Sequence, residues 1–188
     1  MTEDTHSVLV VTKDSKISQT IGIMLMPPLF ETEVLSDFNE ARRRISERRY
    51  NIILADYAEG KGEDFAVDAS ESLSTILLLT PTALFEEVSY RVEGYGIITL
   101  SNPFDQFYFY SMIKAAIAVQ YKVQVLSSQT TKLKVKMEEI KLVNRAKMLL
   151  MQNMAMAEAE AHRYIEKEAM DTGQKKIAGA EKIIKPSG

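Results

Sequence analysis

The third of five short, mainly apolar runs in the chain is Asn51-Ile52-Ile53-Leu54-Ala55, and the carboxylate of Asp56 follows it directly. The other four runs are Val8-Leu9-Val10-Val11, Glu33-Val34-Leu35, Ile76-Leu77-Leu78-Leu79 and Ile97-Ile98-Thr99-Leu100. An apolar run without alternating polar residues is typical of a strand that is covered on both faces. Helical patterns separate the runs, so the sequence predicts an α/β fold with five parallel strands.

Alternation of this kind is typical of a flavodoxin-like, doubly wound sheet, in which polar groups gather at the carboxyl ends of the strands. Asp56, Thr80 and Asn102 occupy such ends, after the third, fourth and fifth runs. The segment from Ala58 to Ser74 is rich in Gly, Asp, Glu and Ser, so we expect its helix to be short or irregular.

A second pattern begins in the last helix of this domain. Apolar and small residues recur in steps of four and three at Met112, Ala116, Val119, Val123, Leu126, Thr130, Leu133, Met137 and Ile140, without Pro or Gly. The spacing predicts one long helix to about Met154 with a coiled-coil seam. For the dimer seam itself we expect Val119, Val123, Leu126, Leu133, Met137 and Ile140. The alternative is a single helix that packs back on its own domain, but residues 121–141 are polar outside the seam.

The last third of the chain has no strand pattern. Ala155–Glu158 is a plausible break, Ala159–Met170 a second helix, and Asp171-Thr172-Gly173 a turn before a third helical stripe of Ile177, Ala180, Ile183 and Ile184. Three short helices make a minimal bundle that needs support from dimerisation. We therefore expect three parts: a domain over 1–119, a coiled-coil linker over 120–141 and an all-α three-helix bundle over 142–185.

Charge is distributed unevenly. Residues 1–120 carry 10 Lys/Arg and 18 Asp/Glu, a balance of −8, whereas residues 121–188 carry 13 and 8, a balance of +5. A basic tail favours a polyanionic partner. There is no cysteine, and no apolar stretch approaches the length of a membrane span. Because the start of the chain is polar and acidic, we expect a cytoplasmic protein without a membrane partner.

No nucleophile, base and orienting group stand together in the sequence, so we expect no enzymatic activity, no cofactor and no metal site. His162 has no second histidine or acid at metal-binding spacing, which favours a surface position.

The first domain resembles the receiver domain of two-component response regulators, over about residues 7–119. Asp56 matches the family's phosphoacceptor and Thr80 its hydroxyl residue. The family's acidic pair for magnesium corresponds to Thr12 and Lys13, and its fifth-strand lysine to Asn102. Because carboxyl phosphorylation needs a cation held by oxygen ligands, these departures predict a pseudo-receiver with Asp56 paired to Lys13.

The tail, Val143 to Ile184, contains the run Asn144-Arg145-Ala146-Lys147-Met148-Leu149-Leu150-Met151, followed by Glu160-Ala161, Ala169-Met170 and Ala180. In these residues it resembles the ANTAR domain of the AmiR and NasR transcription antiterminators. The chain departs from the family at three positions: Met148 stands where the family often has Gly, Gly173 where it often has Asn, and Lys176 where it has Leu. A shift of register by one residue would put Ile177 at the position of that Leu. The family's order of receiver, coiled coil and bundle is the order expected here.

This resemblance implies binding to hairpins of nascent RNA by a dimer. The candidate RNA-binding residues are Arg145, Lys147, Gln152, Arg163, Lys167, Lys175 and Lys176, with Lys147 favoured because it lies inside the motif. Tyr164 could stack on an RNA base, but its helical spacing from Ala161 and Ile165 favours a place in the core of the bundle.

The leading hypothesis is therefore an RNA-binding antitermination regulator whose receiver-like domain is a docking or sensing surface, with a regulatory protein as a further partner. The alternatives are a phosphorylatable response regulator and an adaptor whose tail binds DNA or protein. Binding to hairpin RNA and to duplex DNA at the same salt concentration separates them.

Overall fold

The structure, a computed structural model, describes residues 5–171 and 176–184. The chain divides into two compact units, Met1–Val125 and Leu126–Gly188, with the boundary inside one helix. The division expected from the sequence, into 1–119, 120–141 and 142–185, stays a prediction.

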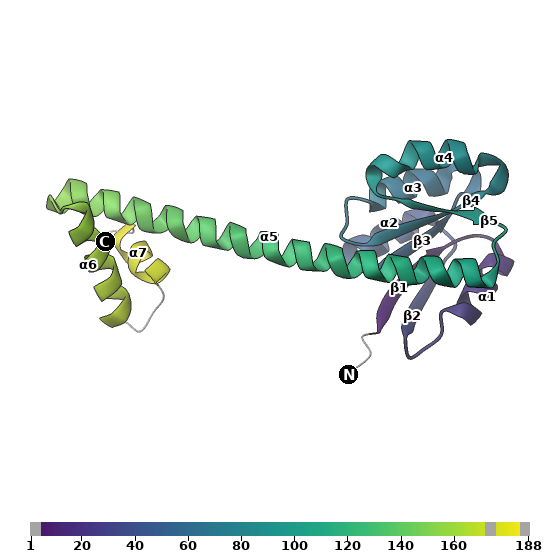
Figure 1. Ribbon diagram of the computed structural model, residues 1–188, viewed down its shortest axis with the longest axis horizontal. Coiled ribbons are helices and arrows are strands. Elements are labelled where there is room, and N and C mark those ends of the chain that lie inside the picture. The colour runs from purple at the N-terminus through teal and green to yellow at the C-terminus, as the bar shows by residue number, and fades with distance from the viewer. Residues whose placement is uncertain (1–4, 172–175, 185–188) are drawn as a thin grey trace. The chain divides into compact units, whose positions relative to one another are not determined.

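The first unit alternates strands and helices (Figure 1). Its strands are β1 (His6–Val11), β2 (Phe30–Leu35), β3 (Ile52–Asp56), β4 (Thr75–Pro81) and β5 (Ile98–Asn102). Its helices are α1 (Ser15–Met24), α2 (Phe38–Glu47), α3 (Lys61–Ala69), α4 (Phe85–Val92) and the first part of α5 (Gln106–Met154), with 3-10 turns η1 (Ala58–Gly60), η2 (Thr82–Leu84) and η3 (Glu93–Tyr95).

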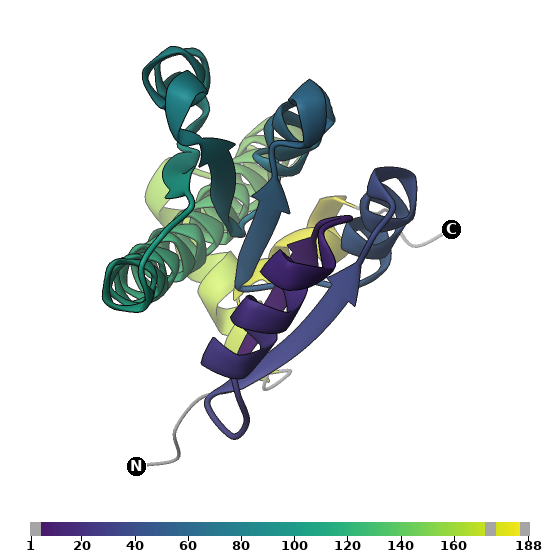
Figure 2. The same cartoon turned by 90° about the vertical axis from the view of Figure 1, so that its right-hand side faces the viewer.

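The five strands form one parallel sheet in the order β2-β1-β3-β4-β5. Helices α1 and α5 cover one face, and α2, α3 and α4 cover the other (Figure 2). The predicted flavodoxin-like, doubly wound fold is confirmed. Because all five strands run in one direction, their carboxyl ends share an edge, where Asp56, Thr80 and Asn102 lie.

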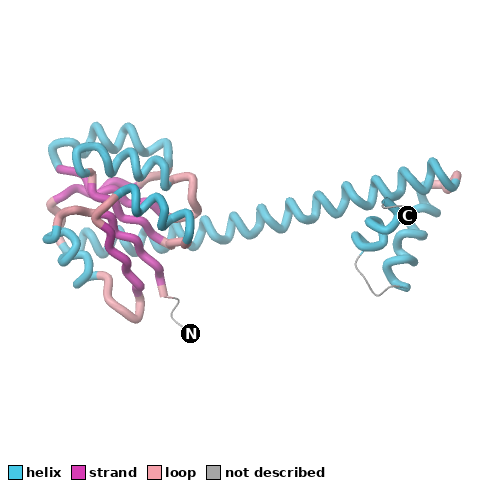
Figure 3. Tube along the Cα trace, turned by 180° about the vertical axis from the view of Figure 1, so that it is seen from behind, coloured by secondary structure: helices cyan, strands magenta, loops and turns pink. Residues whose placement is uncertain are grey.

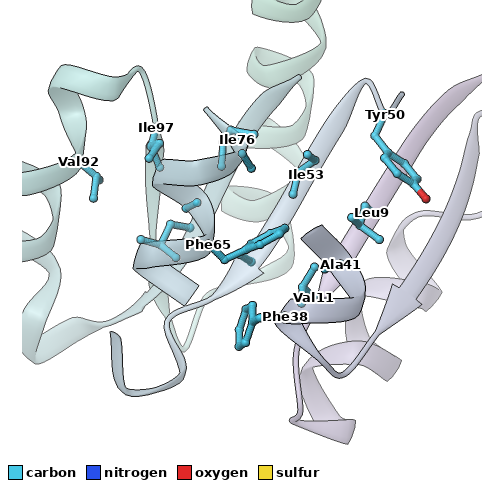
Figure 4. Packing of buried hydrophobic residues seen from close by; sticks show 14 of the residues in the cluster. Leu9, Val11, Phe38, Ala41, Tyr50, Ile53, Phe65, Ile76, Val92 and Ile97 are labelled. Carbon is cyan, nitrogen blue, oxygen red and sulfur yellow. The ribbon is translucent and has the colours of Figure 1, made fainter. Parts of the chain in front are cut away.

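Apolar side chains fill both faces of the sheet. Beneath α2, α3 and α4 the core includes Leu9, Ile53, Phe65 and Ile76, all at most 2% exposed (Figure 4). Burial of one such side chain contributes about 1.5–3 kcal/mol. The aspartates Asp14 and Asp37 cap α1 and α2, and each carboxylate accepts two backbone N–H bonds.

The backbone turns sharply after β3. Ala58, Glu59 and Gly60 all have positive φ, at 45°, 58° and 93°. Gly62 then packs directly on the end of the strand, since a Cβ there would lie 1.7 Å from the carbonyl oxygen of Asp56. The expected irregular segment is thus a tight left-handed turn followed by α3, a regular helix of nine residues.

The second unit consists of α5 from Leu126 onward, α6 (Glu158–Asp171) and α7 (Lys176–Ile184) (Figure 3). Their shared core contains Ala146, Leu150, Ala161, Ile165 and Ala180. The three alanines let the helices approach closely, and a Cβ on Gly179 would lie 3.3 Å from the carbonyl oxygen of Ile165. The long helix to Met154 and two further helices are as predicted. The expected turn at Asp171-Thr172-Gly173 extends beyond the described residues.

Candidate functional site

Asp56 is the last residue of β3 and is half-buried. The hydroxyl of Thr12 donates a hydrogen bond to its Oδ2 at 3.2 Å, and the backbone N–H of Asp14 donates to that hydroxyl at 3.0 Å. Burial raises the pKa of the Asp56 carboxyl, and the negative charge of Asp14 adds to the increase, while the Thr12 bond opposes it. The carboxylate is therefore held by a neutral donor.

Lys13 does not form the expected ion pair with Asp56. Among the described residues no ion pair links the two side chains; the positive charge of Lys13 acts on Asp37 instead. The pKa of Asp37 is lowered chiefly by the N–H of Glu40, and Lys13 adds to this. The reason is that Thr12, which follows β1 directly, is buried and faces Asp56, whereas the next residue, Lys13, is exposed to solvent.

Thr80 and Asn102 occupy the predicted strand ends without bonding Asp56. Thr80 is fully buried, and its hydroxyl donates to the carbonyl of Leu78 at 3.4 Å. The carbonyl of Asn102 accepts from the hydroxyl of Thr82 at 3.4 Å. The strand register pairs Thr80 with Ser101 and Pro81 with Asn102, so these two candidates sit on neighbouring strands.

The residues present at this edge do not fit magnesium. The two positions that would flank Asp56 with oxygen ligands are a threonine and a lysine. The remaining acid, Asp14, is occupied because its carboxylate caps α1 through the N–H groups of Lys16 and Ile17. In the described ranges no cluster of three or more His, Asp or Glu side chains could hold a metal ion.

Asp56→Asn is expected to stabilise the protein at neutral pH. Because the pKa of Asp56 is raised above its ordinary value of 3.8, the charged carboxylate opposes folding increasingly as pH rises from 3.8 through the raised pKa. The amide keeps an acceptor for Thr12 and removes this charge. The melting temperature should rise by at most about 4 °C, which corresponds to about 1 kcal/mol in a domain of this size. Thermal unfolding at several pH values checks this: the difference should vanish on acidification, and a difference that grows there would contradict it.

In the second unit, Lys147 is already engaged. Its ammonium lies 2.8 Å from Glu158 Oε1 at the start of α6, and its side chain is 17% exposed against 70% for Glu158. The hydrogen bond from Lys147 lowers the pKa of the Glu158 carboxyl. An RNA phosphate would have to replace this carboxylate, so the RNA contact expected for Lys147 stays a prediction.

The other candidates divide between two helices. Arg145 and Gln152 lie exposed on α5, and Arg163 and Lys167 lie exposed on α6. Lys175 lies outside the described residues, and of Lys176 and Ile177 only the α7 backbone is described. His162 lies at the surface as expected, 3.3 Å from Glu166 one turn along α6.

The ANTAR domain model matches residues 131–184. This range covers the bundle and the second half of the seam, from Leu133 to Ile140. The chain carries an ANTAR domain behind a receiver fold. Comparison with curated proteins gave no significant match.

Solved structures similar to this chain include a signal receiver domain and a response regulator receiver protein. The signal receiver domain of an HD domain-containing protein from Pseudomonas fluorescens Pf-5 is 17% identical, with a TM-score of 0.57 over 66% of this chain and 94% of that one. NtrX from Brucella abortus is 15% identical, with a TM-score of 0.60 over 67% of this chain and 30% of NtrX. An adenylate cyclase from Rhodopirellula baltica is 20% identical, with a TM-score of 0.60 over 70% and 98%. At these identities the likeness shows the fold alone.

Two features of the ANTAR protein were missed or misjudged from sequence. The partnership of Lys147 with Glu158 spans the break between α5 and α6, and no helical spacing signals it. Tyr164 was expected in the core but is 40% exposed, because Ala161, Ile165 and Ala169 take the buried face of α6. The signal was available: these three residues are spaced by four, and Tyr164 lies beside that row rather than on it.

Proposed function

We propose that this ANTAR protein is an RNA-binding transcription antitermination regulator. The observation that carries the proposal is the ANTAR domain at residues 131–184. In support, residues 121–188 are basic, with a balance of +5. The mechanism we propose is binding to hairpins of nascent RNA that compete with a terminator, without catalysis by the chain.

We further propose that the protein acts as a dimer through its seam. Leu126, Leu133, Met137 and Ile140 are each 52–63% exposed in the single chain, and Val119 is 44% exposed. Residues in steps of four and three return to one face of a helix, so these side chains form an apolar row on α5 that only Thr130 interrupts. A second copy supplies the same row and removes both from water.

The receiver fold is proposed as a docking or sensing surface for a regulatory protein in the cytoplasm. It lacks a set of oxygen ligands for magnesium around Asp56, and Asn102 replaces the cation that would stabilise a developing phosphoryl charge. Regarding membranes, the structure contains no helix among its described residues with the length and apolarity to cross a bilayer.

Incubation with acetyl phosphate and magnesium, or with beryllofluoride, should leave the protein unchanged. Phosphorylation of Asp56 requires a divalent cation, and Thr12 and Lys13 do not provide for one. Intact mass spectrometry measures phosphorylation by acetyl phosphate, and the melting temperature measures binding of beryllofluoride. A receiver that carries the acidic pair is the positive control for both. A stable acyl phosphate on Asp56 would contradict this part of the proposal.

RNA binding is tested by selection. RNA hairpins with randomised loops are selected on the full-length protein, and the affinity of the enriched hairpin is compared with that of a DNA duplex of the same stem at one salt concentration. The proposal expects the RNA to bind more tightly than the duplex. Equal or tighter binding of DNA, or no enrichment, would replace it with a DNA-binding or adaptor function.

A further inference from the structure

Tyr164 is the one Phe, Tyr or Trp between residues 126 and 188. The core of the bundle is built without it, from alanine, leucine and isoleucine side chains. The ring lies on α6 and is 40% exposed. An aromatic ring that the core does not use, on a small bundle, is available for contact with a partner.

Two cations flank the ring. Arg163 precedes Tyr164, and Lys167 follows it by three residues, so all three lie within about one turn of α6. Arg163 and Lys167 lie roughly opposite the buried row of Ala161, Ile165 and Ala169. Both are exposed, and neither forms an ion pair with a residue that the structure describes.

The acids of α6 do not neutralise these cations. Glu158 binds Lys147, and the carboxylate of Glu160 accepts a hydrogen bond from the backbone N–H of Ala157. Oε1 of Glu166 lies 3.3 Å from Nε2 of His162. Oε1 of Glu168 lies 3.7 Å from Nζ of Lys182. In the part of α6 whose side chains are described, every carboxylate thus has a partner within the bundle. The two cations are left over for an external anion.

We infer that the outer face of α6, formed by Arg163, Tyr164 and Lys167, is the surface that holds RNA. Arg163 and Lys167 contact phosphates, and Tyr164 stacks on an unpaired base of the hairpin loop. Single-stranded loops offer a charged backbone together with free base faces, whereas the bases of a duplex are stacked and paired. This inference rests on the proposed function and assigns its contact to α6 rather than to Arg145 and Gln152 of α5.

The charges are tested by the double variant Arg163→Gln/Lys167→Gln in the full-length protein, with the selected hairpin as probe. Its matched control is Lys141→Gln/Arg145→Gln, which removes the same charge from α5. The α6 variant should lower the slope of log affinity against log salt by about 1.4 to 1.8, because each lost phosphate contact accounts for about 0.7 to 0.9. The control should keep the wild-type slope. Equal slopes for wild type and the α6 variant, or a loss confined to the α5 variant, would overturn the inference.

The ring is tested by Tyr164→Leu and Tyr164→Phe. Leucine should weaken hairpin binding about 5- to 150-fold, the range for loss of one stacked base, whereas phenylalanine should retain affinity. Circular dichroism and light scattering on both variants establish that helix content and dimer mass are unchanged. A change of mass with leucine would assign the ring to the dimer contact and overturn the inference.

These outcomes separate the inference from the proposed function. If the wild-type protein binds the selected hairpin and the α6 variants bind it equally well, RNA binding stands and the surface lies elsewhere. If the wild-type protein enriches no RNA, both fall.

Discussion

Replacement of Leu133 and Ile140 together by lysine is expected to convert the protein from a dimer to a monomer. The two side chains are seven residues apart on the seam and are 63% and 54% exposed in the single chain. Neither belongs to the bundle core, so the substitution should leave the fold of each chain intact. The dimer loses four buried apolar side chains, each worth about 1.5–3 kcal/mol, which weakens association at least about 10⁴-fold.

The matched control for this prediction is Ser128→Lys/Val135→Lys. These two positions are also exposed and seven residues apart on α5, but they lie on the side away from the seam. Light scattering measures the mass of both variants. The account predicts monomers from the seam variant and dimers from the control, and a dimeric seam variant would show that α5 does not hold the two copies together.

Leu150→Ala is expected to unfold the bundle. Leu150 is 4% exposed and packs in the core shared by α5, α6 and α7. Truncation of a buried leucine to alanine costs about 2–5 kcal/mol. A core this small supplies no more than about 3–5 kcal/mol, so little or no stability should remain. Loss of α6 and α7, which have 14 and 9 residues, is then visible as lost helix signal by circular dichroism.

Met148→Ala is the control for Leu150→Ala on the same helix. Met148 is 59% exposed, so its truncation should leave the helix signal and the hairpin affinity unchanged. Leu150→Ala should abolish hairpin binding together with the helix signal. Retention of full helicity in Leu150→Ala would mean that α6 and α7 are stabilised by something other than this core, such as the second copy.

The fold was predictable because the strands are continuous apolar runs, which a two-sided sheet requires. The predicted bounds were less accurate for strand β2, which is not a continuous apolar run. Strand β2 was expected at Glu33 but begins at Phe30. It lies at the edge of the sheet, so exposed Glu31 is tolerated inside it and breaks the apolar run.

The positions of Asp56, Thr80 and Asn102 at strand ends were predictable, whereas the contacts around Asp56 and Lys147 were not. Sequence reasoning placed Lys13 beside Asp56, because it closely follows the first strand. The strand register brings the end of β1 next to β3 and puts the Thr12 hydroxyl there instead. In the tail, the motif pointed to Lys147, but its partner Glu158 lies beyond a helix break whose geometry depends on Ala155, with φ of 52°. Contacts across turns follow from backbone conformation, which residue spacing does not encode.

The central claim, antitermination through a bound hairpin, is tested most directly by transcription in vitro. The template places the selected hairpin so that it overlaps the stem of an intrinsic terminator, and a second template carries a scrambled loop. The account predicts that wild-type protein raises the fraction of full-length transcript on the first template alone, and that Arg163→Gln/Lys167→Gln does not. An unchanged fraction of full-length transcript, under conditions where the wild-type protein binds the hairpin, would contradict it.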